Sequence, residues 1–144
     1  MKHNAKYVLM NQDVNTAGVT TVTGTVDTLG FRYASITFAA ATTNGAHTTI
    51  SNHAVEQSDA AASGFVAIPG FTAGTDWTPS SVAILTNVAK ITYNIDLRGR
   101  KRYLKVTFGS QAVNVAGVLS AVLTNAENGV STAAEQGAAF TVNG

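Results

Sequence analysis

The stretch Ile91-Thr92-Tyr93-Asn94-Ile95-Asp96-Leu97 carries the clearest structural signal in the chain, because apolar residues occupy every odd position and polar residues every even one. A period of two is typical of a β-strand that buries one face and exposes the other. The range 102–108 repeats the pattern, with its apolar side chains at even positions. Gly99 lies between the two ranges and can adopt the positive φ that tight turns often need. The two ranges are therefore predicted to pair as a β-hairpin.

Residues typical of strands continue on both sides of this pair. Valine and threonine favour strands because their branched side chains fit a pleated sheet and lose freedom in a helix. Further strands are predicted at 7–10, 19–26, 31–40, 48–57, 64–68, 82–85 and 116–124. Short strands separated by Gly, Pro and Asn turns predict an all-β, single-domain β-sandwich, and a jelly roll fits the chain length.

The sandwich is expected to occupy residues 1–124, followed by an irregular C-terminal arm at 125–144. The arm is rich in Ala, Gly and Asn and contains the strand-like Phe140-Thr141-Val142. It is either a frayed terminus or a segment that adds a strand to the sheet edge of a neighbouring subunit.

Composition points to association rather than to disorder. Charged residues make up 12% of the chain, against about 25% in an average soluble domain. Hydrophobic residues make up 45% and the net charge is +1, whereas disordered chains combine low hydrophobicity with high net charge. A surface so poor in charge favours self-association. The chain has no cysteine, and no run of residues matches a signal peptide or a transmembrane helix, so synthesis in the cytoplasm and no membrane contact are expected.

No pattern of an enzyme, a cofactor or a metal is found in the sequence. The eight acidic residues are scattered, no Gly-x-Ser-x-Gly elbow occurs, and no phosphate-binding glycine loop leads into a helix. His47 and His53 are six residues apart, which fits neither one strand face nor a tight ligand turn, and His3 is near the terminus. We therefore predict no catalytic residue, no cofactor, no metal and no small-molecule substrate.

A basic cluster follows the alternating stretch Ile91–Leu97. Its members are Arg98, Arg100, Lys101, Arg102 and Lys105. It is a solvated turn that keeps the sheet from pairing wrongly, an anchor for carboxylates of a neighbouring subunit, or a phosphate-binding patch. The neighbour's candidate carboxylates are Glu56, Asp59 and Asp76. The small net charge, and Tyr103 as the only aromatic residue beside the turn, argue against nucleic acid.

Trp77 forms an apolar stretch with Phe71 and Pro79 in a predicted loop. Either the loop folds back on its own core, or Trp77 is an exposed hot spot at an interface, where tryptophan is enriched. Trp77, Phe140 and the basic cluster are the candidate interface residues.

Three segments resemble small virion proteins of tailed bacteriophages. They are Gly30-Phe31-Arg32-Tyr33, Val55-Glu56-Gln57-Ser58-Asp59 with the following small-residue loop and Phe65, and residues 95–106 with their Arg-Gly-Arg-Lys-Arg turn. The resemblance spans residues 30–108. It implies a capsid decoration (cement) or minor capsid protein on the capsid exterior, made in the bacterial host cytoplasm. The implied partners are further copies of the chain and the major capsid protein, and no catalytic residue is implied.

Three alternatives stay open. A single jelly roll can also serve as the shell protein of a tailless phage. A glycan- or receptor-binding sandwich would need an exposed aromatic platform, for which Trp77 with Phe71 is the candidate. A nucleic-acid binder is the third.

Overall fold

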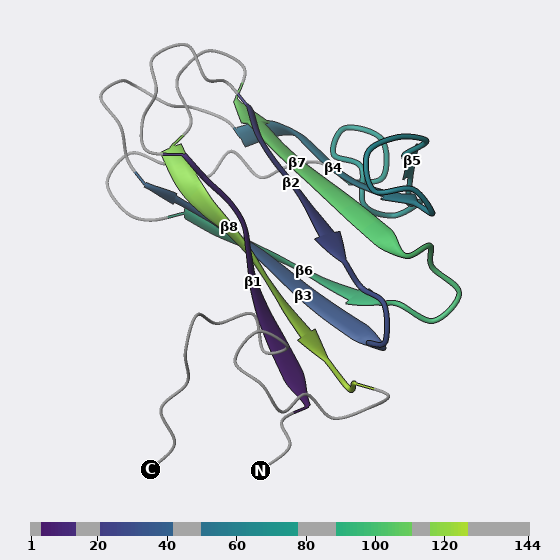
Figure 1. The fold of residues 1–144 in the computed structure, drawn as a ribbon. Helices are drawn as coiled ribbons and strands as arrows, with labels where there is room; N and C mark the ends of the chain where they lie inside the picture. Colours follow the sequence, from purple (N-terminus) through teal and green to yellow (C-terminus); the bar gives the residue numbers. More distant parts are fainter. Residues whose placement is uncertain (1–3, 14–20, 42–49, 78–88, 111–115, 127–144) are drawn as a thin grey trace, which may run out of the picture.

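The structure is a computed structural model that describes residues 4–13, 21–41, 50–77, 89–110 and 116–126. It contains eight strands in two packed layers (Figure 1). The strands are β1 Ala5–Asp13, β2 Thr21–Asp27, β3 Tyr33–Ala41, β4 Ile50–Ser58, β5 Val66–Ala67, β6 Ala89–Asp96, β7 Tyr103–Ser110 and β8 Ala116–Thr124. Within these ranges, no helix has the length and apolar character needed to cross a membrane.

The two sheets have the strand order of a jelly roll. The first sheet runs β1-β8-β3-β6 and the second β2-β7-β4-β5, with every pair antiparallel. The pairs β1–β8, β2–β7, β3–β6 and β4–β5 are nested, as in one long double strand rolled up so that successive pairs alternate between the layers. This arrangement confirms the predicted all-β sandwich and its jelly-roll variety.

The predicted hairpin between 91–97 and 102–108 is wrong. β6 lies at the edge of the first sheet and pairs with β3, whereas β7 lies inside the second sheet between β2 and β4. The segment between them crosses from one layer to the other (Figure 1). A period of two specifies which face of a strand is buried but not which strand lies beside it, and two apolar faces can confront each other across a core as well as lie in one sheet.

The faces predicted for the strands are confirmed. In β6 and the residue after it, Tyr93, Ile95 and Leu97 are buried, and in β7 the even positions Leu104, Val106 and Phe108 are. The strands expected at 7–10, 19–26, 31–40, 48–57 and 116–124 are present with small shifts at their ends, 64–68 is reduced to β5, and 82–85 lies outside the described residues.

Aromatic rings join the two layers at the centre of the core. Phe38 of the first sheet stacks on Phe108 of the second with ring centroids 4.6 Å apart, and Tyr93 stacks on Phe108 at 5.7 Å. Burying an apolar side chain of this size contributes about 1.5–3 kcal/mol. The core is therefore held by side chains from both sheets, and neither sheet can bury its apolar face without the other.

The edge strands β1 and β2 approach each other closely and close one side of the sandwich. The Asn11 amide donates a hydrogen bond to the Thr23 carbonyl at 2.6 Å, which links the two sheets. A Cβ atom at Gly24 would lie 2.7 Å from Cβ of Met10 and 2.9 Å from Cδ2 of Leu119. Only glycine leaves room for this approach.

Substituting Gly24 by alanine is expected to destabilise the fold by about 1–3 kcal/mol, because the added methyl group must displace β1 or Leu119. Urea unfolding measures the change. Thr25→Ala, at the next and exposed position, is the control and should stay within about 0.5 kcal/mol of the parent chain. A Gly24→Ala chain as stable as the parent would show that the two edges are not packed as described.

Candidate functional site

Two connections between the layers lie side by side at one end of the sandwich and have the same local structure. We call them crossings: residues 28–32 join β2 to β3, and residues 97–102 join β6 to β7. In each, an aspartate ends a strand and accepts the backbone N–H two residues later: Leu29 donates to Asp27 and Arg98 to Asp96, both at 3.0 Å. A turn closed by a hydrogen bond follows, with Gly30 at φ 83° in one crossing and Gly99 at φ 76° in the other. Glycine suits these positions because other residues rarely adopt positive φ.

Backbone hydrogen bonds tie the two crossings together. The Thr28 amide donates to the Arg102 carbonyl at 3.0 Å, and the Leu97 amide donates to the Arg32 carbonyl at 2.9 Å. The Thr28 hydroxyl also donates to the Arg102 carbonyl, at 2.7 Å. The backbone on both sides of the basic cluster is therefore held by hydrogen bonds to the other crossing, unlike the tip of an isolated hairpin.

Arg98 pairs with the aspartate that starts its own turn. Its Nε donates to Oδ1 of Asp96 at 3.0 Å and its terminal nitrogen to Oδ2 at 2.5 Å. These hydrogen bonds lower the pKa of Asp96 to about 2. The guanidinium also lies over the Tyr33 ring, 5.7 Å from its centroid. Arg98 thus stabilises its own loop, although the pair is exposed to solvent.

Arg102 connects the two crossings through its side chain. It binds Asp27 with two parallel hydrogen bonds, from Nε to Oδ1 at 3.0 Å and from the terminal nitrogen to Oδ2 at 2.7 Å. The hydrogen bond from Arg102 is the main cause of the lowered pKa of Asp27. The guanidinium lies 4.9 Å from the centroid of the Tyr103 ring. This two-pronged geometry is available to arginine and not to lysine.

The two lysines of the cluster also have partners in the same chain. Lys101 lies 3.3 Å from a carboxylate oxygen of Asp59, and Lys105 lies 2.6 Å from Glu56 directly opposite on β4. Lys105 also sits over the Phe65 ring at 4.8 Å. Asp59 and Glu56 are two of the carboxylates expected on a neighbouring subunit, and the structure uses both of them internally.

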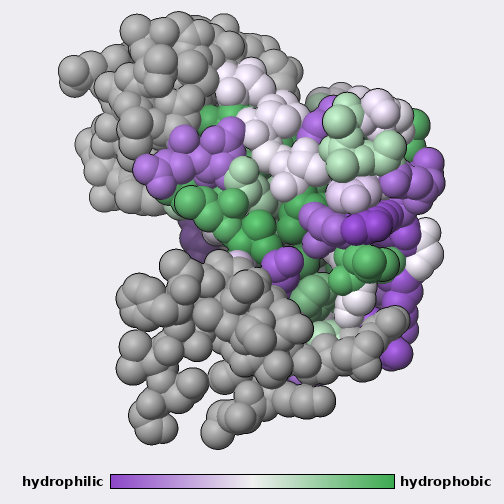
Figure 2. All heavy atoms as spheres, viewed as in Figure 1, coloured by the Kyte–Doolittle hydropathy of each residue, from purple (hydrophilic) through white to green (hydrophobic). Residues whose placement is uncertain are grey.

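The third expected carboxylate, Asp76, is also used within the chain, since it accepts the Thr72 backbone amide at 2.9 Å. Of the five cluster residues, only Arg100 has no ion pair or side-chain hydrogen bond within the described part of the chain. On the face seen in Figure 2, hydrophilic side chains alternate with hydrophobic ones and form no single broad patch. The interface role of the cluster stays a prediction, with Arg100 the member best placed for it.

The loop that follows β5 packs against the core on the side opposite β1 and β2. The Ala73 amide donates to the His53 carbonyl at 2.9 Å, and the Gly74 amide donates to the Trp77 carbonyl at 2.8 Å. The half-buried rings of Phe71 and Trp77 contact Tyr93 at centroid distances of 5.8 and 6.4 Å. The loop therefore folds back on its own core, which is the first of the two interpretations of Trp77 given above. Phe140, the other aromatic interface candidate, lies outside the described residues.

His53 is buried in this aromatic core, with its ring 4.8 Å from Phe108 and 5.7 Å from Trp77. The other two histidines lie outside the described ranges. Within those ranges, no three His, Asp or Glu residues gather where they could hold a metal ion.

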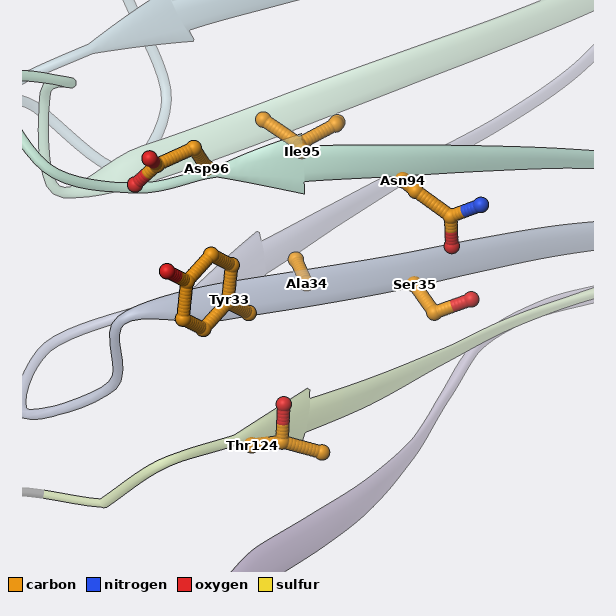
Figure 3. Close-up of a pocket in the computed structure, with 7 residues that line it drawn as sticks. All are labelled: Tyr33, Ala34, Ser35, Asn94, Ile95, Asp96 and Thr124. Atoms are coloured by element: carbon orange, nitrogen blue, oxygen red, sulfur yellow. The ribbon is translucent and has the colours of Figure 1, made fainter.

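An open pocket of about 390 Å³ lies on the outer face of the first sheet, near the two crossings (Figure 3). Its lining residues are Tyr33, Ala34, Ser35, Asn94, Ile95, Asp96 and Thr124. Ser35 lies directly opposite Asn94, and Tyr33 opposite Asp96. An aromatic ring beside hydroxyl, amide and carboxylate groups can hold a polar ligand such as a sugar. Tyr33 was not singled out as an aromatic platform from the sequence, because only its place in the pocket distinguishes it.

The outer face around this pocket is nearly free of charge. Among the outward side chains of its described strand residues only Lys90 and Asp96 are charged, and both belong to β6. Arg98, just beyond the end of β6, adds a third charge beside the pocket, where it pairs with Asp96 and lies over the Tyr33 ring. The face also carries four large exposed apolar or aromatic side chains, namely Tyr7, Leu9, Tyr33 and Val118. Strand register places them in neighbouring rows across β1, β8 and β3. A face of this kind is typical of surfaces that contact another protein.

Comparison with protein-family models, with curated proteins and with solved structures finds no match to this chain.

Replacing Asp96 by asparagine is expected to lower the melting temperature at pH 6 by a few degrees and to have almost no effect at pH 2. Because the folded pKa of Asp96, about 2, lies below the unfolded value of about 3.9, the carboxylate stabilises the fold above about pH 4. That contribution is lost as the pH falls from about 4 to 2. Asparagine keeps the acceptor for the Arg98 amide, so the comparison isolates the charge. Thermal unfolding across this pH range measures it.

High salt provides the control, since screening should shrink the difference at pH 6. A difference between the two chains that is the same at pH 6 and pH 2 would contradict the assignment of the lowered pKa to this ion pair.

Proposed function

We propose that this chain is a structural protein of a bacteriophage virion that decorates or stabilises the capsid, through self-association and contacts with the major capsid protein. The observation that carries the proposal is the outer face of the first sheet, where exposed apolar side chains lie on a surface with few charges. Such a face costs little to desolvate, because few charged groups must lose their water.

The internal ion pairs support the same proposal. Four of the five cluster cations are matched by carboxylates of the same chain, so much of the positive charge that could bind nucleic acid is balanced within the described residues. A protein that tiles a surface makes many modest contacts at once, and their combined strength exceeds that of any single one. The jelly roll occurs in viral capsid domains and also in lectins and cupins, so the fold is compatible with this function without implying it.

A second candidate is the shell protein of a tailless phage. The eight-stranded jelly-roll order favours it, since a single domain of this kind can tile a shell by itself. The two functions differ in whether a second coat protein is needed. Purified chain that assembles into closed shells alone supports the second candidate, whereas chain that binds only to preformed heads supports the first.

Substituting Leu9 by aspartate is expected to reduce co-sedimentation of the purified chain with phage heads at least about tenfold, because the change places a charge in the centre of a contact face. Leu9 is 60% exposed, so the fold should tolerate the substitution. Leu29→Asp is the matched control: Leu29 is 65% exposed but lies between β2 and β3 and not on a strand of the outer face, and binding should be retained.

Mass spectrometry of purified particles should also find the chain at a fixed ratio to the major capsid protein. Equal loss of binding in the Leu9 and Leu29 variants would remove the outer face from the proposal. A parent chain that is absent from particles and does not bind heads would overturn the virion function itself.

A further inference from the structure

We propose that two copies of this chain pair edge to edge through β6, antiparallel and related by a twofold axis at Tyr93. The pairing would join the two first sheets into one continuous eight-stranded sheet. This inference deepens the self-association part of the proposed function by naming the surface and the partner.

Of the four edge strands in the described part of the chain, β6 alone is neither bulged, nor very short, nor hydrogen-bonded to the opposite sheet. β1 is interrupted by a bulge between Leu9 and Asn11, and β2 accepts a hydrogen bond from Asn11 through its Thr23 carbonyl. β5 has only two residues. Bulges, short strands and covered edges are the usual ways in which proteins block edge-to-edge contact. β6 is eight residues long and pairs with β3 without a register shift.

The backbone of β6 offers a row of hydrogen-bonding groups on its outer side. The Leu97 amide points toward β3, where it donates to the Arg32 carbonyl. Because successive residues of a strand direct their N–H and C=O groups to opposite edges, the even positions from 90 to 96 point away from β3. Within the described residues, β3 is the only strand that pairs with β6. An edge of this kind can accept a further strand.

The sequence of β6 is complementary to itself in the antiparallel direction. With the axis at Tyr93, Lys90 lies opposite the partner's Asp96, and Thr92 lies opposite the partner's Asn94. The apolar Ile91 lies opposite the partner's Ile95 on the core side. In this register Lys90 meets the partner's Asp96, a carboxylate that also accepts hydrogen bonds from Arg98 of its own chain. Even positions meet even positions, as hydrogen bonding requires.

Charge on an edge strand ordinarily prevents pairing, because a second copy brings the same charge to the same place. Here the two charges have opposite sign and lie at equal distances from Tyr93, so the second copy matches each of them. The same arrangement disfavours shifted registers, in which Lys90 or Asp96 has no opposite charge across the axis. Self-complementarity therefore selects a second copy of this chain rather than an unrelated strand.

The resulting contact is small compared with a stable interface, which typically buries about 1,200–2,000 Å². The dimer should therefore be reversible in dilute solution and favoured where subunits are crowded on a common surface. Pairing through β6 leaves Tyr7 and Leu9 on the distant β1 edges free for other contacts.

Charge reversal tests the register directly. Lys90→Asp alone places two aspartates opposite each other at both ends of the contact, and Asp96→Lys alone places two lysines there. Each variant alone should self-associate at least about tenfold more weakly than the parent chain. An equimolar mixture of the two variants restores opposite charges at both positions and should form heterodimers with the strength of the parent dimer. Sedimentation velocity over a concentration series measures the self-association of each variant and of their mixture, and compares it with that of the parent chain.

Restoration in the mixture also answers the concern that Asp96→Lys disturbs its loop, because a misfolded variant could not restore pairing. Thr25→Asp, which adds a negative charge to the exposed face of the other sheet, is the control and should dimerise like the parent. A parent chain that stays monomeric at every concentration, single variants that dimerise like the parent, or a mixture that does not recover would each overturn the proposal. These results are independent of binding to phage heads, which the Leu9 and Leu29 variants report.

Discussion

The whole structure depends on one constraint, which is that every long strand has a single apolar face and must turn it toward another strand's apolar face. Phe38 and Phe108 meet this constraint at the centre, where rings from the two sheets stack 4.6 Å apart. The nested order of the strands follows, because a chain that alternates between two layers brings apolar faces together from both sides. The sandwich is then closed by β1 against β2 on one side and by the loop carrying Trp77 on the other.

The arrangement of the strands determines which charged groups are paired within the chain and which apolar groups stay exposed. The crossings place the basic cluster beside Asp27, Asp96, Asp59 and Glu56, so most of its charge is neutralised inside the chain. The outer face of the first sheet keeps apolar side chains, and its described strand residues contribute only two charges, one of which, Asp96, pairs with Arg98. Among the described residues, the surfaces that remain for partners include an apolar face with its open pocket, the outer edge of β6 and Arg100.

Sequence periodicity predicted the class of fold, most strands and the buried sides of β6 and β7, because burial of one face leaves a period of two in the sequence. It did not predict the partner of β6, since β3 lies far away in sequence and the nearby β7 has an equally regular pattern. The sequence showed the basic cluster but not its partners within the chain, because Asp27 and Glu56 are distant in sequence and come next to the cluster only in the folded sandwich. Tyr33 and Gly24 likewise have no local signal, since the pocket and the close approach of β1 arise from distant segments.

Disulfide formation between engineered cysteines tests the order of the strands most directly, because the chain has no cysteine of its own. Thr37 and Thr92 lie opposite each other on β3 and β6 with their hydroxyl oxygens 3.1 Å apart, so Thr37→Cys with Thr92→Cys should form a disulfide within one chain. A hairpin of residues 91–97 with 102–108 would instead place Thr92 opposite Thr107. Because β6 and β7 lie in different sheets, cysteines at 92 and 107 should remain two free thiols under the same oxidation. A disulfide between 92 and 107, with none between 37 and 92, would contradict it.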